Sequence, residues 1–436
     1  MTPKTGELRM LTEQFAQYAS AMLADRPLET VAICAAGWWV DDQGALRMLL
    51  REWRLAGESD YLRRSPGGAV VKAEFIAPSV KRARDTNESV VLSHTHPFST
   101  TPSFSGIDDG GEDVLVPKIR ERAPEGPHGG FVLGSEGGSV RAWPKGSNLP
   151  ITLALRRIGA MPADVGIGAP EYHRQDLALG PGTSSVLASK HVAVIGAGGL
   201  GWPIATHAAA HGVGTITIVD PDVIDETNRP RLPGSQPKHV GLNKVDALAA
   251  VLAETRPDTK VVPIVAALAD RTARSAIASA DAIVVATDNL FSRLRADHFA
   301  RRLLIPLIDV GVNIELRGQA VRSVGGRVNV SWPLGPCLTC MGVLSPDRVA
   351  VEVDPIGYRG TGRSEEAAVM AFNATLAGLA MVELLALVLP MRREARASRY
   401  VVYDGLRGVV REIATPMPGA CGTCGGLLGA VFGALP

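Results

Sequence analysis

The hydrophobic pattern of the chain changes near residue 146. Before that point, apolar residues recur every three or four positions over residues 7–24, which predicts an amphipathic helix. Three strands are predicted in the same region: a buried strand at Thr30–Trp38, a strand with weak alternation at Leu46–Leu55, and a short apolar strand at Val90–Ser93. We therefore predict an α/β domain over residues 1–145.

A stretch with frequent glycine and proline, residues 146–182, predicts a linker and an N-terminal arm, with a short helix at Ile151–Ile158. Beyond it, short apolar strands alternate with helical periodicity. Strands are expected at His191–Ile195, Thr215–Asp220, Val261–Val265, Ala282–Ala286 and Leu307–Val310. Helices are expected from the glycine-rich loop to His211 and at 243–254, 270–279 and 290–303. This alternation predicts a doubly wound, Rossmann-like parallel sheet over residues 183–436.

Composition removes several classes of function. The 436 residues include 45 basic and 44 acidic side chains, a balance that argues against a nucleic acid partner. Residues 1–8 are polar and no apolar segment follows, so we expect a cytoplasmic protein without a secretory leader. The apolar stretch 367–390 contains Asn373 and Glu383, which favours a buried helix over a membrane span.

The cysteines predict a structural metal site. Four of the five form two C-x-x-C pairs, Cys337 with Cys340 and Cys421 with Cys424, and a set of four thiolates is typical of structural Zn²⁺. The fifth, Cys34, lies within a predicted strand, where a small buried residue is expected. The chain therefore has no spare cysteine for an enzyme thioester.

A second metal site is predicted in the first region. His94 and His96 are two positions apart at the end of a predicted strand, so both imidazoles lie on one side of it. With Asp108 they make a set of three ligands that leaves a fourth position open, as catalytic zinc sites do. Ser105 adds a hydroxyl, and Glu29, before a buried strand, is the candidate general base.

These residues occur in the order Glu, H-x-H-P, S-x-x-D, and residues 5–145 resemble the JAB/MPN (JAMM) metallopeptidases. The resemblance implies zinc ligands His94, His96 and Asp108, general base Glu29, and Ser105 as a group that stabilises the oxyanion. It also implies cleavage after the C-terminal glycine of ubiquitin-like proteins. Seven residues separate Pro97 from Ser105, one more than in the family pattern, so Asp109 stays an alternative to Asp108. A non-catalytic MPN scaffold is the alternative to a peptidase.

A phosphate-binding loop is predicted in the second region. Residues 196–201 read GAGGLG between a strand and a helix, a place where glycines let the backbone approach phosphate. The candidate nucleotide-binding glycines are Gly196, Gly198, Gly199 and Gly201. Asp220 closes the next strand, where a carboxylate can bind ribose hydroxyls. These features alone fit an NAD-dependent oxidoreductase equally well.

The residues that follow favour a triphosphate over NAD. Asn228, Arg231 and Lys244 supply donors that can neutralise phosphoryl oxygens. Asp288 follows a predicted strand, at the edge of the sheet where ligands bind, and can hold Mg²⁺.

Over residues 170–436 the chain resembles the ThiF/MoeB and ubiquitin-activating adenylyltransferases. The matching stretches are Tyr172–Gln175, Gly196–Gly201, Asp220 to Arg231, Gly241–Lys244, Thr287–Asn289 with Arg293, Tyr403–Gly405 and the last cysteine pair. The resemblance implies MgATP-dependent adenylation of the C-terminal carboxylate of a β-grasp protein. It further implies nucleotide contacts from the loop glycines, ribose binding by Asp220, and phosphate contacts from Asn228, Arg231 and Lys244. Asp288 would bind magnesium, and Arg174 would act in the partner's site of a homodimer.

The sequence as a whole predicts a zinc peptidase-like domain fused to an adenylyltransferase. Its expected partners are a ubiquitin-like or sulfur-carrier protein, a conjugating enzyme and a second copy of the chain, with no membrane. Activation of a sulfur carrier for biosynthesis is the alternative to protein conjugation.

Overall fold

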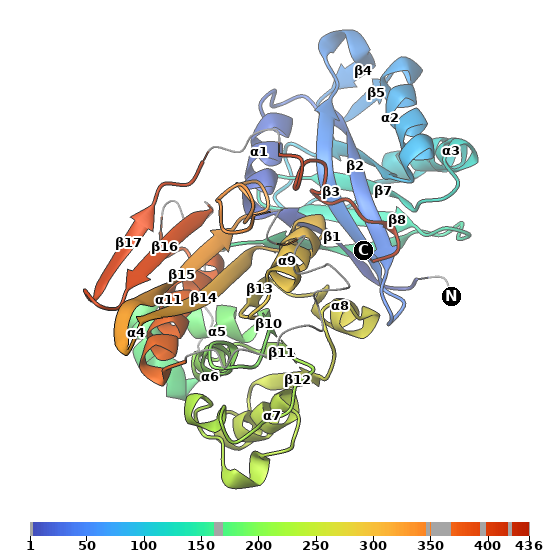
Figure 1. Cartoon of the computed structure of the whole chain (residues 1–436). Helices are drawn as coiled ribbons and strands as arrows, with labels where there is room; N and C mark the ends of the chain where they lie inside the picture. Colours follow the sequence, from blue (N-terminus) through green and yellow to red (C-terminus); the bar gives the residue numbers. More distant parts are fainter. Residues whose placement is uncertain are drawn as a thin grey trace. The chain divides into compact units, whose positions relative to one another are not determined.

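The computed structural model describes residues 3–160, 169–345, 349, 368–392, 398–416 and 421–435 (Figure 1). The chain divides into two units. The first contains Met1–Ile158, Arg302–Leu304 and Leu428–Pro436, and the second contains Gly159–Arg301 and Ile305–Leu427.

The first unit is built on an eight-stranded sheet with the order β18-β2-β3-β1-β9-β8-β7-β6, and β2 also pairs with β6. The strands are β1 (Gly6–Leu11), β2 (Val31–Val40), β3 (Leu46–Leu55), β6 (Ser89–Thr95), β7 (His128–Leu133), β8 (Gly138–Trp143), β9 (Ile151–Ile158) and β18 (Phe432–Gly433). A separate hairpin pairs β4 (Tyr61–Ser65) with β5 (Gly68–Val71). The helices are α1 (Thr12–Met22), α2 (Ala73–Thr86) and α3 (Gly106–Arg122), with a 3-10 turn, η1 (Glu58–Asp60).

Two sequence predictions in this unit are wrong. Residues 6–11 form strand β1, and the helix expected over 7–24 begins only at Thr12. β1 lies between β3 and β9 in the sheet, and its residues Glu7–Leu11 are buried on both faces, so it lacks the alternation of a half-exposed strand. The helix expected at Ile151–Ile158 is strand β9, because it pairs with β1 and β8.

The boundaries of the first unit also differ from the prediction. Because β9 belongs to its sheet, the unit extends to Ile158 instead of residue 145, and the expected linker is correspondingly shorter. The end of the chain, Leu428–Pro436, joins the same unit through β18, and the Trp38 amide donates to the Val431 carbonyl at 2.7 Å. A Cβ at Gly37 would lie 2.1 Å from the Gly429 carbonyl oxygen, so this close approach requires glycine.

The core strand β1 carries a buried ion-pair network. Arg9 is fully buried, and its Nη2 lies 2.8 Å from Oε1 of Glu7. Burial alone raises the pKa of Glu7, but Arg9, Arg156 and Arg47 outweigh it and hold that pKa at about 2. The network satisfies charges that the two-sided burial of β1 would otherwise leave unpaired.

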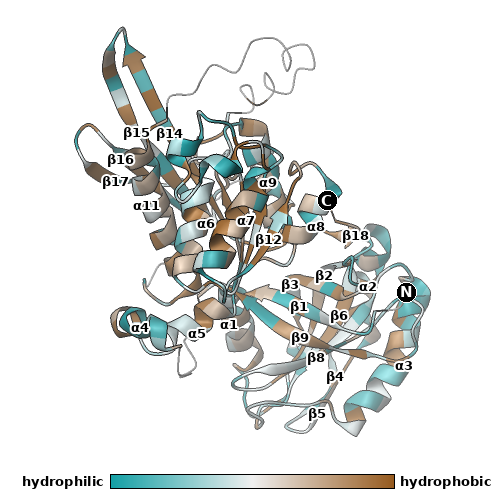
Figure 2. Ribbon diagram, turned by 90° about the horizontal axis from the view of Figure 1, so that it is seen from below, coloured by the Kyte–Doolittle hydropathy of each residue, from teal (hydrophilic) through white to brown (hydrophobic). Residues whose placement is uncertain are grey.

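The second unit contains the doubly wound sheet that the sequence predicts, in the order β12-β11-β10-β13-β14-β15-β16-β17. Its strands are β10 (His191–Ile195), β11 (Thr215–Val219), β12 (Lys260–Ile264), β13 (Ala282–Val285), β14 (Leu307–Arg317), β15 (Ala320–Ser331), β16 (Arg399–Asp404) and β17 (Val409–Ile413). The five strands from β12 to β14 are parallel, and β15, β16 and β17 extend the sheet in antiparallel fashion. β14 and β15 continue past their other neighbours as a two-stranded ribbon of mixed hydropathy (Figure 2).

Helices accompany this sheet in the described part of the chain. They are α4 (His173–Leu179), α5 (Thr183–Ala188), α6 (Gly201–Ala210), α7 (Lys244–Thr255), α8 (Arg271–Ile277), α9 (Leu290–Arg302) and α11 (Met370–Val388). The sequence predicts α6, α7, α8, α9 and α11, but not α4 and α5. Short 3-10 turns occur at η2 (Pro170–Tyr172), η3 (Arg229–Arg231) and η4 (Pro237–His239). Among the described residues, α11 is the one helix long and apolar enough to cross a membrane, with a mean hydropathy of 1.8. Helix α11 packs against α6, β14 and β15. Of its apolar 18-residue stretch, 61% is buried, as in the core helix of a folded domain.

Candidate functional sites

The glycine-rich loop of the second unit joins β10 to α6. Gly196 has a φ of +94°, and a Cβ at Gly201 would lie 1.7 Å from the Gly196 carbonyl oxygen, so the tight turn requires glycine at both positions. A Cβ at Gly198 would have no atom within 4 Å. The loop thus leaves open space before the N-terminus of α6, where backbone amides and the helix dipole favour an anion.

Asp220, the candidate ribose ligand, holds the loop in place. Its Oδ2 accepts a hydrogen bond of 2.7 Å from the Ala197 amide, and its Oδ1 accepts one of 2.8 Å from the Asp222 amide. The residue is buried, and this burial raises the pKa of Asp220 although nearby Lys244 opposes the shift. The Lys244 Nζ lies 2.8 Å from Oδ2 of Asp222, so this lysine points toward the same end of β11.

The other predicted phosphate ligands lie along the next segment. Asn228 is buried, and its Oδ1 accepts a hydrogen bond of 3.0 Å from the Asp225 amide, which shapes the turn before η3. Arg231 ends η3, and its Cδ lies 3.0 Å from the position of a Cβ on Gly199. The structure therefore brings Arg231 directly against the glycine loop.

Asp288 follows β13 and is exposed to solvent. The segment that carries it borders the loop, because a Cβ on Gly196 would lie 3.2 Å from the Thr287 amide nitrogen. Arg293 fixes the position of this segment. It is buried, forms an ion pair with Asp309, and donates to the carbonyls of Thr287 and Val310. The sequence match included Arg293, but only the structure gives it this positioning role.

Asn373 is a site residue that sequence reasoning missed. It lies in the first turn of α11, and its Nδ2 is 2.4 Å from the position of a Cβ on Gly199. No local motif indicates it, because 174 positions of the chain separate residues 199 and 373.

Arg174 does not lie at the glycine loop of its own chain. It belongs to α4 and is exposed, and its neighbours attach α4 to the opposite end of α6. The Tyr172 ring lies 2.8 Å from the position of a Cβ on Gly212, and the Gln175 Nε2 donates to the His211 carbonyl at 3.1 Å. Since α6 has ten residues and rises about 1.5 Å per residue, its two ends are about 15 Å apart.

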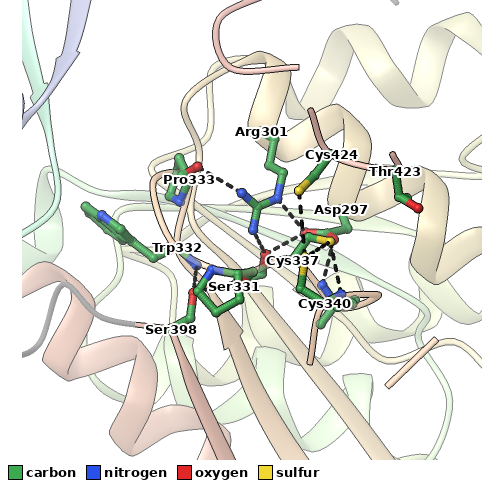
Figure 3. A network of polar contacts seen from close by, with 12 residues as sticks. Asp297, Arg301, Ser331, Trp332, Pro333, Cys337, Cys340, Ser398, Thr423 and Cys424 are labelled. Atoms are coloured by element: carbon green, nitrogen blue, oxygen red, sulfur yellow. Dashed lines mark hydrogen bonds and ion pairs between the residues drawn. The ribbon is translucent and has the colours of Figure 1, made fainter. Parts of the chain in front are cut away.

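The four predicted zinc cysteines converge in the second unit. Cys337, Cys340 and Cys424 are labelled in Figure 3 with the polar network beside them. The four sulfur atoms all lie within 4.8 Å of one another. The Sγ atom of Cys337 is 3.5 Å from that of Cys340 and 4.0 Å from that of Cys421, and Cys340 and Cys424 are 4.0 Å apart. Tetrahedral Zn²⁺ with Zn–S bonds of about 2.3 Å places its sulfurs about 3.8 Å apart, so the four thiols fit this ion.

In the first unit, the structure brings the predicted zinc ligands together at the carboxyl end of β6. The Nε2 atom of His94 lies 3.3 Å from that of His96 and 2.9 Å from Oδ1 of Asp108, and the His96 Nε2 lies 3.5 Å from Oδ2 of Asp108. Three donor atoms converge on one point, which fits a divalent transition metal such as Zn²⁺. Burial opposes ionisation of Asp108, but His94 and Ser105 outweigh it and lower its pKa well below the usual range.

The two aspartates at positions 108 and 109 have different partners. Asp109 is turned away from the histidines, and its Oδ1 lies 2.7 Å from Nη1 of Arg141. Arg141 also pairs with Glu112 and covers the Phe104 ring, with its Cζ 3.8 Å from the centroid. This geometry favours Asp108 as the third ligand.

Ser105 and Glu29 complete this cluster. Ser105 is the N-cap of α3: its Oγ accepts from the Asp108 amide at 3.3 Å and donates to the Asp108 carboxylate at 2.7 Å. The ladder between β2 and β6 pairs Val31 with His94, and one residue further the Thr95 amide donates to the Thr30 carbonyl. Glu29 comes just before Thr30, burial raises the pKa of its carboxyl, and the charges of His94 and Asp108 act on the same group.

The second unit is thus an α/β fold with a glycine-rich loop after strand β10 and a cluster of four cysteines. Residues 172–423 match the ThiF family, and the chain belongs to this family.

Several known proteins are similar to parts of this chain. The SAMP-activating enzyme E1 of Haloferax volcanii is 33% identical over 169 residues, which cover 39% of this chain and 59% of that protein. The adenylyltransferase and sulfurtransferase MOCS3 of Dictyostelium discoideum is 25% identical over 240 residues, or 55% of this chain and 52% of that protein. The crystal structure of E. coli MccB with MccA-N7isoASN is 19% identical, with a TM-score of 0.49 over 60% of this chain and 77% of that chain. The chain therefore spans only about half the length of these two curated relatives.

Proposed function

We propose that the second unit uses MgATP to adenylate the C-terminal glycine of a ubiquitin-like or sulfur-carrier β-grasp protein. The observation that carries this proposal is that Arg231 lies against Gly199 and the Asp288 segment borders Gly196, on either side of Gly198, which faces open space. Family membership supports it, and so do the names of relatives, which describe a SAMP-activating enzyme and an adenylyltransferase.

In this reaction a carboxylate oxygen of the carrier attacks the α-phosphorus of ATP. The new O–P bond forms as the bond between the α-phosphorus and its bridging oxygen breaks, so pyrophosphate leaves and no proton is transferred. Arg231 and Lys244 offset the negative charge that accumulates on the phosphoryl oxygens. Asp288, exposed after the end of β13, would hold Mg²⁺, which would offset negative charge on the phosphates.

We further propose that the active species is a homodimer, in which Arg174 enters the nucleotide site of the partner. Attachment of α4 to the far end of α6 supports this arrangement, because it keeps Arg174 away from the loop of its own chain. An exposed guanidinium with a planar fork of donors suits a triphosphate.

We propose that the acyl-adenylate forms without an enzyme thioester. Four thiols lie in the cysteine cluster, and the fifth, Cys34, is only 1% exposed. Burial raises the pKa of Cys34 to about 12, so it is a poor nucleophile. The activated carrier would pass to a separate acceptor, a sulfur donor or a conjugating enzyme.

Isotope exchange between pyrophosphate and ATP tests the adenylation. Glycine-terminated β-grasp proteins of the source organism are assayed one by one with the full chain. Exchange that depends on a carrier and is lost in Asp288→Asn supports the proposal. If none of these carriers stimulates exchange and the chain does not bind ATP, the proposal fails.

For the first unit we propose a second activity, zinc-dependent cleavage after the C-terminal glycine of the same carrier class. The convergence of His94, His96 and Asp108 supports it, together with the buried Glu29, whose carboxyl interacts electrostatically with His94 and Asp108. Zn²⁺ would supply Lewis acidity at this point. Glu29 would accept a proton from the attacking water and return it to the leaving amine, and the Ser105 hydroxyl would donate to the developing oxyanion.

Cleavage of a carrier that is extended at its C-terminal glycine tests this activity. The assay compares the unaltered chain with Glu29→Gln, and zinc content is measured for both. If the unaltered chain contains zinc and does not cleave, the first unit is a scaffold and not a peptidase.

A further inference from the structure

The side chain of Asn373 is buried against the glycine loop. It is 2% exposed, and its Nδ2 lies 2.4 Å from the position of a Cβ on Gly199. The Cδ and Cγ atoms of Arg231 lie 3.0 and 3.2 Å from the same point. The loop, the arginine and the amide of α11 therefore meet at one place.

The side-chain carbonyl of Asn373 lacks a hydrogen-bond donor within the described part of the chain, although its Oδ1 atom is buried. A buried carbonyl without a donor destabilises a fold, and an apolar side chain of the same size would avoid that cost. The rest of α11 is mostly apolar, so the asparagine is an exception on this helix. A buried carbonyl without a donor next to a ligand site is explained if it gains its hydrogen bond when the ligand binds.

The chemistry of the three groups indicates what satisfies it. Phosphoryl oxygens only accept hydrogen bonds, a guanidinium only donates them, and a carboxamide does both. A carboxamide between a phosphate and an arginine can therefore pair with each of them. Asn373 also lies in the first turn of α11, where the helix dipole favours a negative charge.

We propose that Asn373 is a phosphate-binding residue that links ATP to Arg231. Its Nδ2 donates to a phosphoryl oxygen, and its Oδ1 accepts from the Arg231 guanidinium when that arginine contacts the nucleotide. The inference deepens the proposed adenylation and depends on ATP binding at this loop.

The test measures binding of MgATP and of adenosine, which has no phosphate, to the full chain by calorimetry. Asn373→Leu keeps the side-chain size and removes both polar functions, and Asn373→Ala serves if the leucine variant does not fold. Asn373→Asp keeps an acceptor and adds a charge that repels phosphate. Thr375→Val is the matched control, because its hydroxyl bonds within the same helix to the Ala371 carbonyl.

Asn373→Leu should weaken ATP binding about tenfold or more, the usual effect of losing a hydrogen bond to a charged group, and leave adenosine binding unchanged. Asn373→Asp should weaken ATP binding further, and Thr375→Val should bind ATP normally. If Asn373→Leu or Asn373→Ala binds ATP normally, the inference about Asn373 fails and the proposed adenylation stands. The same conclusion follows if the substitution weakens ATP binding and adenosine binding equally. An unaltered chain that does not bind ATP overturns the proposed function and this inference with it.

Discussion

Oδ2 of Asp297 accepts a hydrogen bond of 2.9 Å from the backbone amide of Leu338, the residue that follows Cys337. Asp297 is fully buried in α9, and its Oδ1 accepts a further bond of 2.6 Å from the Ser331 hydroxyl. Arg301 donates to the same hydroxyl at 2.9 Å and to the Pro333 carbonyl at 2.9 Å. A buried charged network thus orients the first cysteine pair before any ion binds.

The Asp297→Asn variant should hold zinc more weakly, by about 10- to 100-fold, because groups behind the ligands fix their orientation. It should also unfold more easily, because Arg301 then lacks its buried partner. Zinc content after dialysis against a chelator and thermal unfolding measure both effects. Glu412→Gln, which alters an exposed partner of Arg399, is the control and should behave normally. Full zinc retention in Asp297→Asn would contradict the role of this network.

Alanine at three glycines should have three different effects. Gly201→Ala should disrupt the loop, because the new Cβ would lie 1.7 Å from a backbone oxygen. Gly198→Ala should fold normally but lose ATP affinity, because its methyl group enters the space that we assign to phosphate. Gly378→Ala, in α11 with open space around it, should bind ATP normally and be slightly more stable. Thermal unfolding and ATP titration separate the cases; normal ATP affinity of Gly198→Ala would refute the phosphate assignment.

Two inactive variants should restore activity when mixed. Arg174→Ala and Asp288→Ala each remove one component of the nucleotide site. In a mixed dimer with Arg174 acting in trans, one site has an intact Asp288 from the first chain and an intact arginine from the second. Pyrophosphate exchange of the mixture measures the recovery. If exchange stays absent although subunit exchange is verified with differently tagged chains, the arginine does not act in trans.

Substitutions in the first unit should separate metal binding from proton transfer. Glu29→Gln should keep zinc and lose cleavage, whereas His94→Ala combined with His96→Ala should lose both. Asp108→Ala should lose zinc, and Asp109→Ala should keep it because Asp109 pairs with Arg141. Metal analysis and cleavage of an extended carrier measure these outcomes. Loss of zinc from Asp109→Ala but not from Asp108→Ala would reverse the ligand assignment.

The ion pairs of Glu7 should make the first unit sensitive to acid. Its folded pKa, about 2, lies below the ordinary 4.5, so the stabilisation is complete above pH 4.5 and is lost as the pH falls toward 2. The shift corresponds to roughly 3 kcal/mol of unfolding free energy. Urea unfolding at pH 7, 4.5 and 3 should show the advantage of the unaltered chain over Glu7→Gln decreasing as the pH falls. A constant difference between the two would show that the carboxylate charge does not contribute.

Much of the architecture follows from local patterns. The strands β10 and β3 begin and end at the residues that the sequence predicts, because a short segment rich in apolar residues between turn residues has few other ways to bury its side chains. The two histidines of H-x-H share one side of their strand because side chains alternate there. The glycine loop, the cysteine pairs and the helices between parallel strands were predictable for the same reason: each depends on neighbouring residues.

What the sequence could not decide depends on contacts between residues that are far apart in the chain. Spacing alone could not identify Gly6–Leu11 as a strand, because its place between β3 and β9 depends on pairing with residues far along the chain. Spacing also could not decide whether Asp108 or Asp109 is the third ligand. That assignment depends on Arg141, which lies on another strand and pairs with Asp109. Asn373 meets Gly199, and Arg174 lies far from that same loop, because of how α11 and α4 pack on α6. The sequence by itself determined which chemical groups are available and in which local elements they lie, since backbone periodicity and turn chemistry act over a few residues. Only the tertiary structure decided which of these groups meet, because that depends on long-range packing.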